Sequence, residues 1–192
     1  IQYHHHHVNY QPQTTTLIHH PHYYQQQLRM DDETAMKRAY EVARSARANG
    51  NHPFGAVVLL DGKIICEAEN TVNTEDNPTG HAETNLMRKV GKLKLSPDEL
   101  KRAVMVTSTE PCVMCCGACY WAGVRTIVYG FQESKLAELA GGDHPENPTL
   151  VLPCRKLFDT ANILSQFTIR GPMLEDEGRE VHGDFWGLGK KE

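Results

Sequence analysis

Two short segments restrict the possible folds of this chain more than any other feature. One is the His-Ala-Glu run at 81–83, and the other is Pro-Cys-Val-Met-Cys at 111–115. Pro111 suits the first turn of a helix, because its missing N–H would be unpaired there anyway. A helix that starts there places Cys112 and Cys115 on one face, one above the other. If the histidine opens a second helix, two facing helix N-termini present one imidazole and two thiolates.

Three such side chains predict a catalytic metal site. Zn²⁺ is usually four-coordinate, so three protein ligands leave a position for water. Zinc lowers the pKa of that water from ~15.7 to roughly 7, so that hydroxide exists at neutral pH. Glu83 is not needed as a ligand, and it is well placed to take up and pass on the water's proton.

A structural zinc site is the alternative interpretation. It requires a fourth protein ligand, and the chain offers several candidates: Cys66, Cys116, Cys119, His52 and His144. Glu83 and the proline before the first cysteine favour the catalytic interpretation. We expect Cys116 and Cys119 to be small buried residues behind the site.

The length and charge of the chain limit its class. Its 192 residues fit one domain with a full core. The formal net charge is −4, so we expect no large polyanion such as nucleic acid as a partner, although a local basic patch stays open.

Nothing in the sequence predicts a membrane span or a secretory signal. The longest apolar-rich runs, 54–60 and 112–124, are shorter than the ~18 residues that a transmembrane helix needs. No charged segment followed by an apolar run stands at the start. Four of the six cysteines crowd into residues 112–119, which suits a reducing compartment. We therefore expect a cytoplasmic location.

Two regions are predicted along the chain. Residues 1–28 are rich in His, Gln, Thr and Tyr, and form either a poorly ordered tail or a His-rich metal-binding tract. Residues 29–192 form the folded domain, with a helical extension from about residue 171.

Strands and helices alternate along the folded domain. Asp61-Gly62 is a strong hairpin signal between the strands 54–60 and 63–69. The other expected strands are 103–108, 126–131 and 166–170, and the expected helices begin near Asp31 or Asp32, His81, Ser96, Pro111 and Ser134. This order predicts a three-layer α/β/α sandwich around a five-stranded mixed sheet, with the metal site at one rim of the sheet.

The segment from Pro172 to Gly187 has the pattern of a helix with an acidic first turn. Leu174, Val181 and Phe185 give it one apolar face. This face either docks on the core, or Phe185 or Trp186 caps the active site of the same subunit or of a neighbour.

Several sequence blocks resemble the cytidine deaminase-like superfamily, in its purine and tRNA branch. They occur in the expected order over about residues 31–143: PFGAVVL, EAEN, NPTGHAET, STEPCVMCCGACYWAG and IVYG. The resemblance implies a zinc-dependent hydrolytic deaminase that acts on a small heterocyclic substrate, commonly as a homodimer. It also implies zinc ligation by His81, Cys112 and Cys115, and proton transfer by Glu83.

The resemblance further implies a set of substrate contacts. Asn70 would hydrogen-bond the base, Phe54 would stack on its ring, and the backbone N–H of Ala82 would help to position it. Asp143 falls where bacterial-type guanine deaminases carry a carboxylate, and a carboxylate accepts two adjacent hydrogen bonds from guanine. Asp143 also follows two glycines, where an aspartate is common for turn reasons alone. Trp186 is a further candidate substrate contact.

The leading prediction is therefore conversion of guanine to xanthine with release of ammonia. The Tyr-Trp-Ala run at 120–122 and the phenylalanine of PFGA resemble bacterial-type guanine deaminases. Beyond Asp143 the chain departs from that pattern, as does Gly80 before the histidine. A tRNA or nucleoside deaminase stays an alternative, and so does a non-catalytic zinc-binding subunit with the same fold.

Overall fold

A five-stranded mixed sheet forms the centre of the fold. The computed structural model describes residues 21–144, 147–148, 150, 152–183 and 185–186, and only the backbone path of residues 21–31, 143 and 147. In chain order the elements are α1 (Pro21–Ala48), β1 (Gly55–Leu60), β2 (Lys63–Glu69), α2 (Ala82–Leu93), α3 (Pro97–Arg102), β3 (Val104–Thr109), α4 (Val113–Ala122), β4 (Thr126–Phe131), α5 (Glu133–Ala140), β5 (Asp143–His144), β6 (Asn147–Pro148), α6 (Cys154–Thr160), a short 3₁₀ helix (Leu164–Gln166), β7 (Thr168–Arg170) and α7 (Glu175–His182).

The strand order in the sheet is β2-β1-β3-β4-β7. β1 is antiparallel to β2 and β3, whereas β3, β4 and β7 are mutually parallel. Asp61 and Gly62 join β2 to β1 with φ angles of 48° and 74°, the left-handed backbone of a tight hairpin turn. The parallel strands β3 and β4 end at the same edge of the sheet, and the loop from β3 into α4 leaves from that edge.

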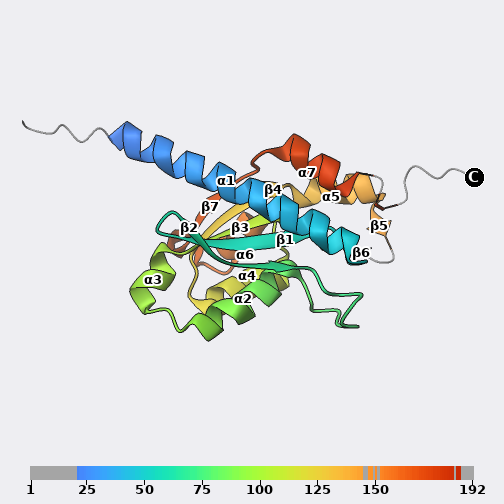
Figure 1. Cartoon of the computed structure of the whole chain (residues 1–192), viewed down its shortest axis with the longest axis horizontal. Helices are drawn as coiled ribbons and strands as arrows, with labels where there is room; N and C mark the ends of the chain where they lie inside the picture. Colours follow the sequence, from blue (N-terminus) through green and yellow to red (C-terminus); the bar gives the residue numbers. More distant parts are fainter. Residues whose placement is uncertain (1–20, 145–146, 149, 151, 184, 187–192) are drawn as a thin grey trace, which may run out of the picture.

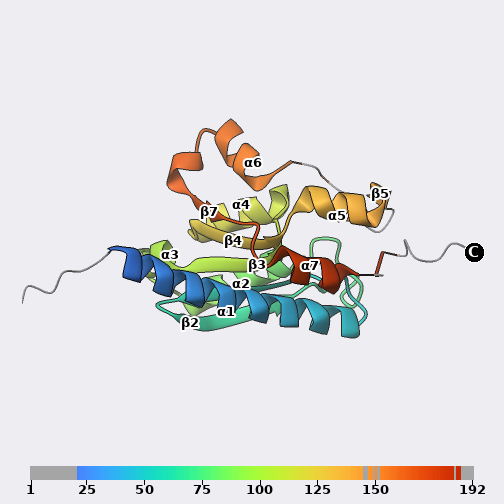
Figure 2. The same ribbon diagram turned by 90° about the horizontal axis from the view of Figure 1, so that it is seen from above.

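Helices cover both faces of the sheet. α1 and α7 lie side by side on one face, and α2 and α4 lie on the other (Figures 1 and 2). Successive strand residues face opposite layers, as the pleat requires. Val57, Val106 and Val128 pack toward α1 and α7, whereas Met105 and Ile127 pack toward α2 and α4. The predicted α/β/α sandwich with a five-stranded mixed sheet is confirmed.

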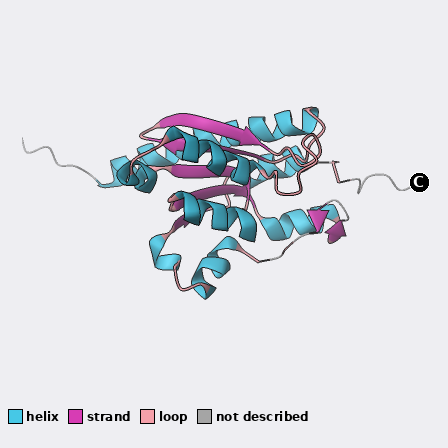
Figure 3. Cartoon of the chain, turned by 90° about the horizontal axis from the view of Figure 1, so that it is seen from below, coloured by secondary structure: helices cyan, strands magenta, loops and turns pink. Residues whose placement is uncertain are grey.

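The small β5–β6 pair lies apart from the main sheet, beyond the end of α5 (Figure 3). The described residues include no helix that is long and apolar enough to span a membrane.

Four helices differ from the prediction, and one of them is α7, which spans only Glu175–His182 of the segment predicted at 172–187. α1 begins at Pro21, ten residues before the predicted start at Asp31, because the preceding segment has no apolar repeat to reveal a helix. The predicted boundary at residue 28 therefore falls within α1, and the tail itself stays a prediction because residues 1–20 lie outside the described part. α6 was not predicted, and α4 begins at Val113 rather than at Pro111.

The sheet meets α1 through a backbone contact at Gly55. A Cβ atom on Gly55 would lie 2.4 Å from the Ala43 nitrogen and 2.5 Å from the Ala39 carbonyl oxygen. These are backbone atoms of a helix, so they cannot move aside as a flexible side chain can. Glycine is therefore required at this position for α1 to pack on the sheet.

We expect Gly55→Ala to destabilise the protein by about 1–3 kcal/mol or more, because overpacking forces the backbone to shift. Gly91→Ala is the matched control, since Gly91 lies in α2 with nothing within 4 Å of an added Cβ. That change should stabilise the protein by roughly 0.5–1 kcal/mol through helix propensity. Urea unfolding of both variants measures the difference, and equal stability of Gly55→Ala and the unaltered chain would contradict the close packing.

Candidate metal centre and its cavity

Two helix N-termini carry the predicted metal ligands. His81 is the N-cap of α2 and Cys112 is the N-cap of α4, both with extended backbone. Cys115 lies in the first turn of α4. The positive end of a helix favours a thiolate over a thiol, so the start of α4 suits cysteine as a metal ligand.

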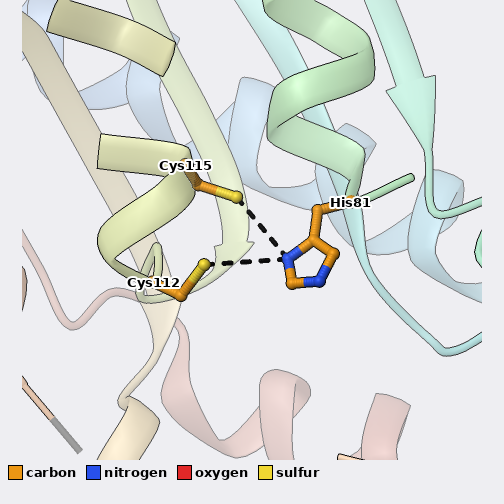
Figure 4. Close-up of side chains that lie close together, drawn as sticks. All are labelled: His81, Cys112 and Cys115. Atoms are coloured by element: carbon orange, nitrogen blue, oxygen red, sulfur yellow. Dashed lines mark hydrogen bonds between the residues drawn. The ribbon is translucent and has the colours of Figure 1, made fainter. Parts of the chain in front are cut away.

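The three ligand atoms converge on one point. His81 Nδ1 lies 3.7 Å from Cys112 Sγ and 3.6 Å from Cys115 Sγ, and all three atoms lie within 4.8 Å of one another (Figure 4). Zn–S bonds of ~2.3 Å and Zn–N bonds of ~2.0–2.1 Å at a tetrahedral angle separate the nitrogen and sulfur atoms by roughly 3.6 Å. The spacing therefore fits a tetrahedral zinc ion bound through Nδ1.

A fourth protein ligand is not found among the described residues. The thiol of Cys116 contacts the Pro111 carbonyl oxygen at 3.4 Å, and that of Cys119 contacts Met105 Sδ at 3.3 Å. Both cysteines are buried, as predicted. In the part of the chain that the structure describes, only His81, Cys112 and Cys115 form a group able to hold a metal. This arrangement leaves one coordination position open.

The two sulfurs differ in how readily they lose a proton. Hydrogen bonding with Cys115, and then contact with His81, lowers the pKa of Cys112 to about 4. The same pairing, together with burial, raises the pKa of Cys115. Of the two sulfurs, Cys112 is therefore the one that loses its proton more readily.

Glu83 lies in the first turn of α2 with its carboxyl group buried beside the metal group. Its Oε1 accepts a hydrogen bond of 2.8 Å from the Thr107 hydroxyl, and its Oε2 lies 3.2 Å from Cys115 Sγ. Burial raises the pKa of Glu83. A carboxyl group with a raised pKa holds a proton more readily near neutral pH, so it is suited both to accept and to return one.

A cavity of about 390 Å³ opens beside these side chains. This volume lies within the roughly 300–1,000 Å³ of small-molecule sites. The cavity is lined by His52, Phe54, Asn70, Val72, Pro78, His81, Glu83, Thr109, Glu110, Cys112, Val113, Met114, Glu133, Pro148 and Leu150. The structure thus brings the metal group, Glu83, Phe54 and Asn70 to one cavity.

The Asn70 side chain has a fixed orientation. Asn70 is buried, and its Oδ1 accepts a 3.0 Å hydrogen bond from the Val72 N–H. The oxygen is therefore the anchored end of the carboxamide, and the Nδ2 group is the end that can donate to a molecule in the cavity.

The other predicted substrate contacts are placed differently. Ala82 is buried as the first residue of α2, where its N–H has no partner within the helix. Asp143 belongs to β5, but its side chain lies outside the described residues. Trp186 is buried without lining the cavity, and its ring packs 5.5 Å from that of His52 and 6.1 Å from that of Phe54. Trp186 therefore supports the cavity wall from behind.

Two acidic residues were missed by the sequence analysis. Glu133 lines the cavity at the start of α5, and burial raises its pKa to about 8. Glu110 is buried, and its carboxylate accepts hydrogen bonds from the backbone N–H groups of Cys154 at 2.9 Å and Glu133 at 3.4 Å. A signal was present for Glu133, because it lies two residues after the end of β4, at the edge of the sheet where α/β proteins bind ligands.

Comparison with known proteins identifies the family. Residues 29–131 match the Cytidine and deoxycytidylate deaminase zinc-binding region. The chain belongs to this deaminase family. This membership confirms three sequence-based predictions: the superfamily, zinc as the metal, and hydrolytic deamination as the class of reaction.

Proteins similar to this deaminase are named for different substrates. A guanine deaminase of Bacillus subtilis is 43% identical over 115 residues, which cover 59% of this chain and 72% of that protein. A probable cytosine deaminase of Schizosaccharomyces pombe is 34% identical over 160 residues, covering 83% and 94%. A solved protein variant in complex with 8-azaguanine has a TM-score of 0.67 at 28% identity and covers 81% of this chain and 84% of its own.

We expect Cys112→Ser to weaken zinc binding by more than the roughly 10–100-fold that follows loss of a residue merely hydrogen-bonded to a ligand. The matched control is Cys116→Ser, which changes the same atom one position beyond Cys115 and keeps a donor for the Pro111 carbonyl. Its zinc affinity should stay close to that of the unaltered deaminase. Competition with a chromogenic chelator measures both, and an equal loss in the two variants would argue against Cys112 as a ligand.

Proposed function

We propose that this deaminase converts guanine to xanthine with release of ammonia. The observation that carries the proposal is the convergence of the His81–Cys112–Cys115 group and the buried Glu83 carboxyl on one small cavity. Guanine as the substrate is supported by the Bacillus subtilis guanine deaminase and by the related structure that binds 8-azaguanine.

In this proposal His81, Cys112 and Cys115 hold the zinc ion. When bound, zinc supplies Lewis acidity that lowers the pKa of water to roughly 7. Glu83 takes the proton of the attacking water and delivers it to the ring nitrogen beside the amine-bearing carbon, and then to the departing ammonia. Thr107 holds Oε1, so Oε2 is the oxygen that faces the metal group.

The remaining residues orient the base. Phe54 forms a ring-stacking wall, and Asn70 donates from Nδ2 to an acceptor of the base, with the Ala82 N–H as a further donor. Asp143 is proposed to accept from the adjacent N1–H and 2-amino donors of guanine. Glu110 and Glu133 add two carboxyl groups to that of Glu83 on the same cavity. Trp186 acts by holding His52 and Phe54 in place.

Cytosine is the second candidate substrate. The probable cytosine deaminase of Schizosaccharomyces pombe matches a longer part of this chain than the guanine deaminase does. Deamination of guanine and of cytosine would use the same metal group and the same Glu83 carboxyl. Only the other side chains that line the cavity can therefore discriminate between the two bases. A tRNA or nucleoside substrate, and a non-catalytic zinc-binding role, are tested by the same assay.

We expect the zinc-loaded protein to release ammonia from guanine faster than from cytosine, adenosine or tRNA. Glu83→Gln should lower turnover by about 10²–10⁴-fold or more, because it removes the proton acceptor, while zinc stays bound. Glu138→Gln, an exposed change on α5, is the control and should leave turnover unchanged. Faster ammonia release from cytosine would identify cytosine, and not guanine, as the preferred substrate. No ammonia release from any of the compounds tested would favour the non-catalytic role.

We also propose that the protein is a homodimer formed through the face of α2 and α4. Trp121 on α4 is 85% exposed, which is unusual for so large an apolar side chain. It borders a shallow groove that includes Met87, Met114 and Gly117. Met114 lines the metal cavity as well, so a subunit docked in the groove would lie against the cavity wall.

Light scattering should therefore give twice the mass of one chain for the unaltered protein. Trp121→Glu should give the mass of a single chain, because burying the new charge in the interface is costly. Leu93→Glu is the matched control, since Leu93 is also an exposed apolar residue but lies at the far end of α2. A monomeric unaltered protein would refute this arrangement.

A further inference from the structure

A chain of three polar side chains connects the C-terminal helix to the cavity. Thr109, the last residue of β3, is buried and lines the cavity. Its Oγ1 lies 3.0 Å from Nε2 of His182, the last residue of α7. On the other side of the imidazole, His182 Nδ1 lies 3.3 Å from Trp186 Nε1. The assigned metal and acid residues do not account for this chain.

The donor at one end fixes the direction of every hydrogen bond. An indole N–H can only donate, so His182 Nδ1 must accept from Trp186. A neutral imidazole whose Nδ1 accepts carries its proton on Nε2. Burial lowers the pKa of His182 to about 3, so the ring is neutral at physiological pH. The Nε2–H group therefore donates to Thr109 Oγ1.

The consequence appears at the hydroxyl group of Thr109. Its oxygen accepts from His182, and no second hydrogen-bond partner lies among the residues that the structure describes. The hydroxyl proton is therefore left for an acceptor, and the cavity is the space that Thr109 lines. If His182 carried its proton on Nδ1, its Nε2 would instead accept a hydrogen bond from the Thr109 hydroxyl. That hydroxyl could then not donate into the cavity.

We propose that Thr109 is a hydrogen-bond donor to the substrate, with Trp186 and His182 as positioning residues that hold its hydroxyl in the donating direction. The proposal deepens the deaminase function proposed above and rests on it. Together with Asn70 Nδ2, Thr109 gives the cavity a second side-chain donor besides the Ala82 N–H, which suits a base that presents acceptors away from the reacting carbon. In guanine these acceptors are O6 and N7.

The structural interpretation is that the three side chains only tie α7 to the sheet. His182 packs 5.2 Å from the Phe54 ring and 5.6 Å from the Phe131 ring, so it also fills space. The two interpretations differ in one respect. A purely structural contact stabilises the fold in the same way for every substrate. A hydrogen-bond donor favours substrates that have the matching acceptor over substrates that lack it.

The test compares Thr109→Val, which removes the hydroxyl at nearly constant shape, with Thr109→Ser, which retains it. On guanine we expect Thr109→Val to lower kcat/KM by about 10-fold, mainly through KM, because one hydrogen bond to the substrate is lost. Thr109→Ser should restore most of that loss. With 7-deazaguanine, which lacks N7, or 6-thioguanine, which weakens the O6 acceptor, the Thr109→Val penalty should nearly vanish for one of the two. An equal penalty on all three bases would overturn the proposal.

The direction of the hydrogen bonds from Trp186 through His182 to Thr109 is tested without any substrate. In ¹⁵N NMR of the unaltered protein, His182 should carry its proton on Nε2. Trp186→Phe should lose that tautomer preference and part of the discrimination between guanine and its analogue, while Phe185→Leu, an aromatic neighbour in the same cluster, should lose neither. An Nδ1–H tautomer of His182 in the unaltered protein would refute the proposed donation from His182 Nε2 to Thr109. Absence of ammonia release from any base would instead refute the proposed function, leaving the tautomer result to stand by itself.

Discussion

The structure depends on the meeting of two helix N-termini that come from distant parts of the chain. α2 supplies an imidazole and a buried carboxyl group, and α4 supplies two sulfurs. Each group would be costly to bury alone, because a buried thiolate or carboxylate needs a partner. Their spacing fits one zinc ion, which neutralises the sulfurs and explains why both helices start at the same rim. β3 ends at Thr109, directly before Glu110 and Pro111, and so places the start of α4 at this edge of the sheet.

The metal group was predictable because its information is local. His-Ala-Glu and Pro-Cys-Val-Met-Cys each place their side chains within one helical turn, so periodicity and the signature suffice to group them. The hairpin at Asp61-Gly62 and the alternation of strands and helices are local in the same sense, and they led to the correct fold class. The early start of α1 was missed because Gln, Tyr and His give no apolar repeat from which a helix can be inferred.

The cavity wall was harder to predict because it depends on tertiary contacts between distant segments. Glu133 reaches the cavity because β4 ends beside β3, and the Glu110 carboxylate accepts from the N–H of Cys154, 44 residues later. The pairing of Thr109 with His182 spans 73 residues. No spacing rule connects such positions. Trp186, a candidate substrate contact, packs against His52 and Phe54, and only side-chain packing shows such neighbours.

The hydrogen bonds that α7 makes have a consequence for the choice of substrate. Residues 81–115 hold the reactive groups, whereas the last turn of α7 reaches the cavity through Thr109 and the aromatic rings around it. The metal ligands and the histidine that contacts the Thr109 hydroxyl therefore lie in separate parts of the sequence. On the proposed role of Thr109, a substitution in α7 that displaces His182 would alter how the cavity discriminates between heterocycles and leave the metal ligands in place.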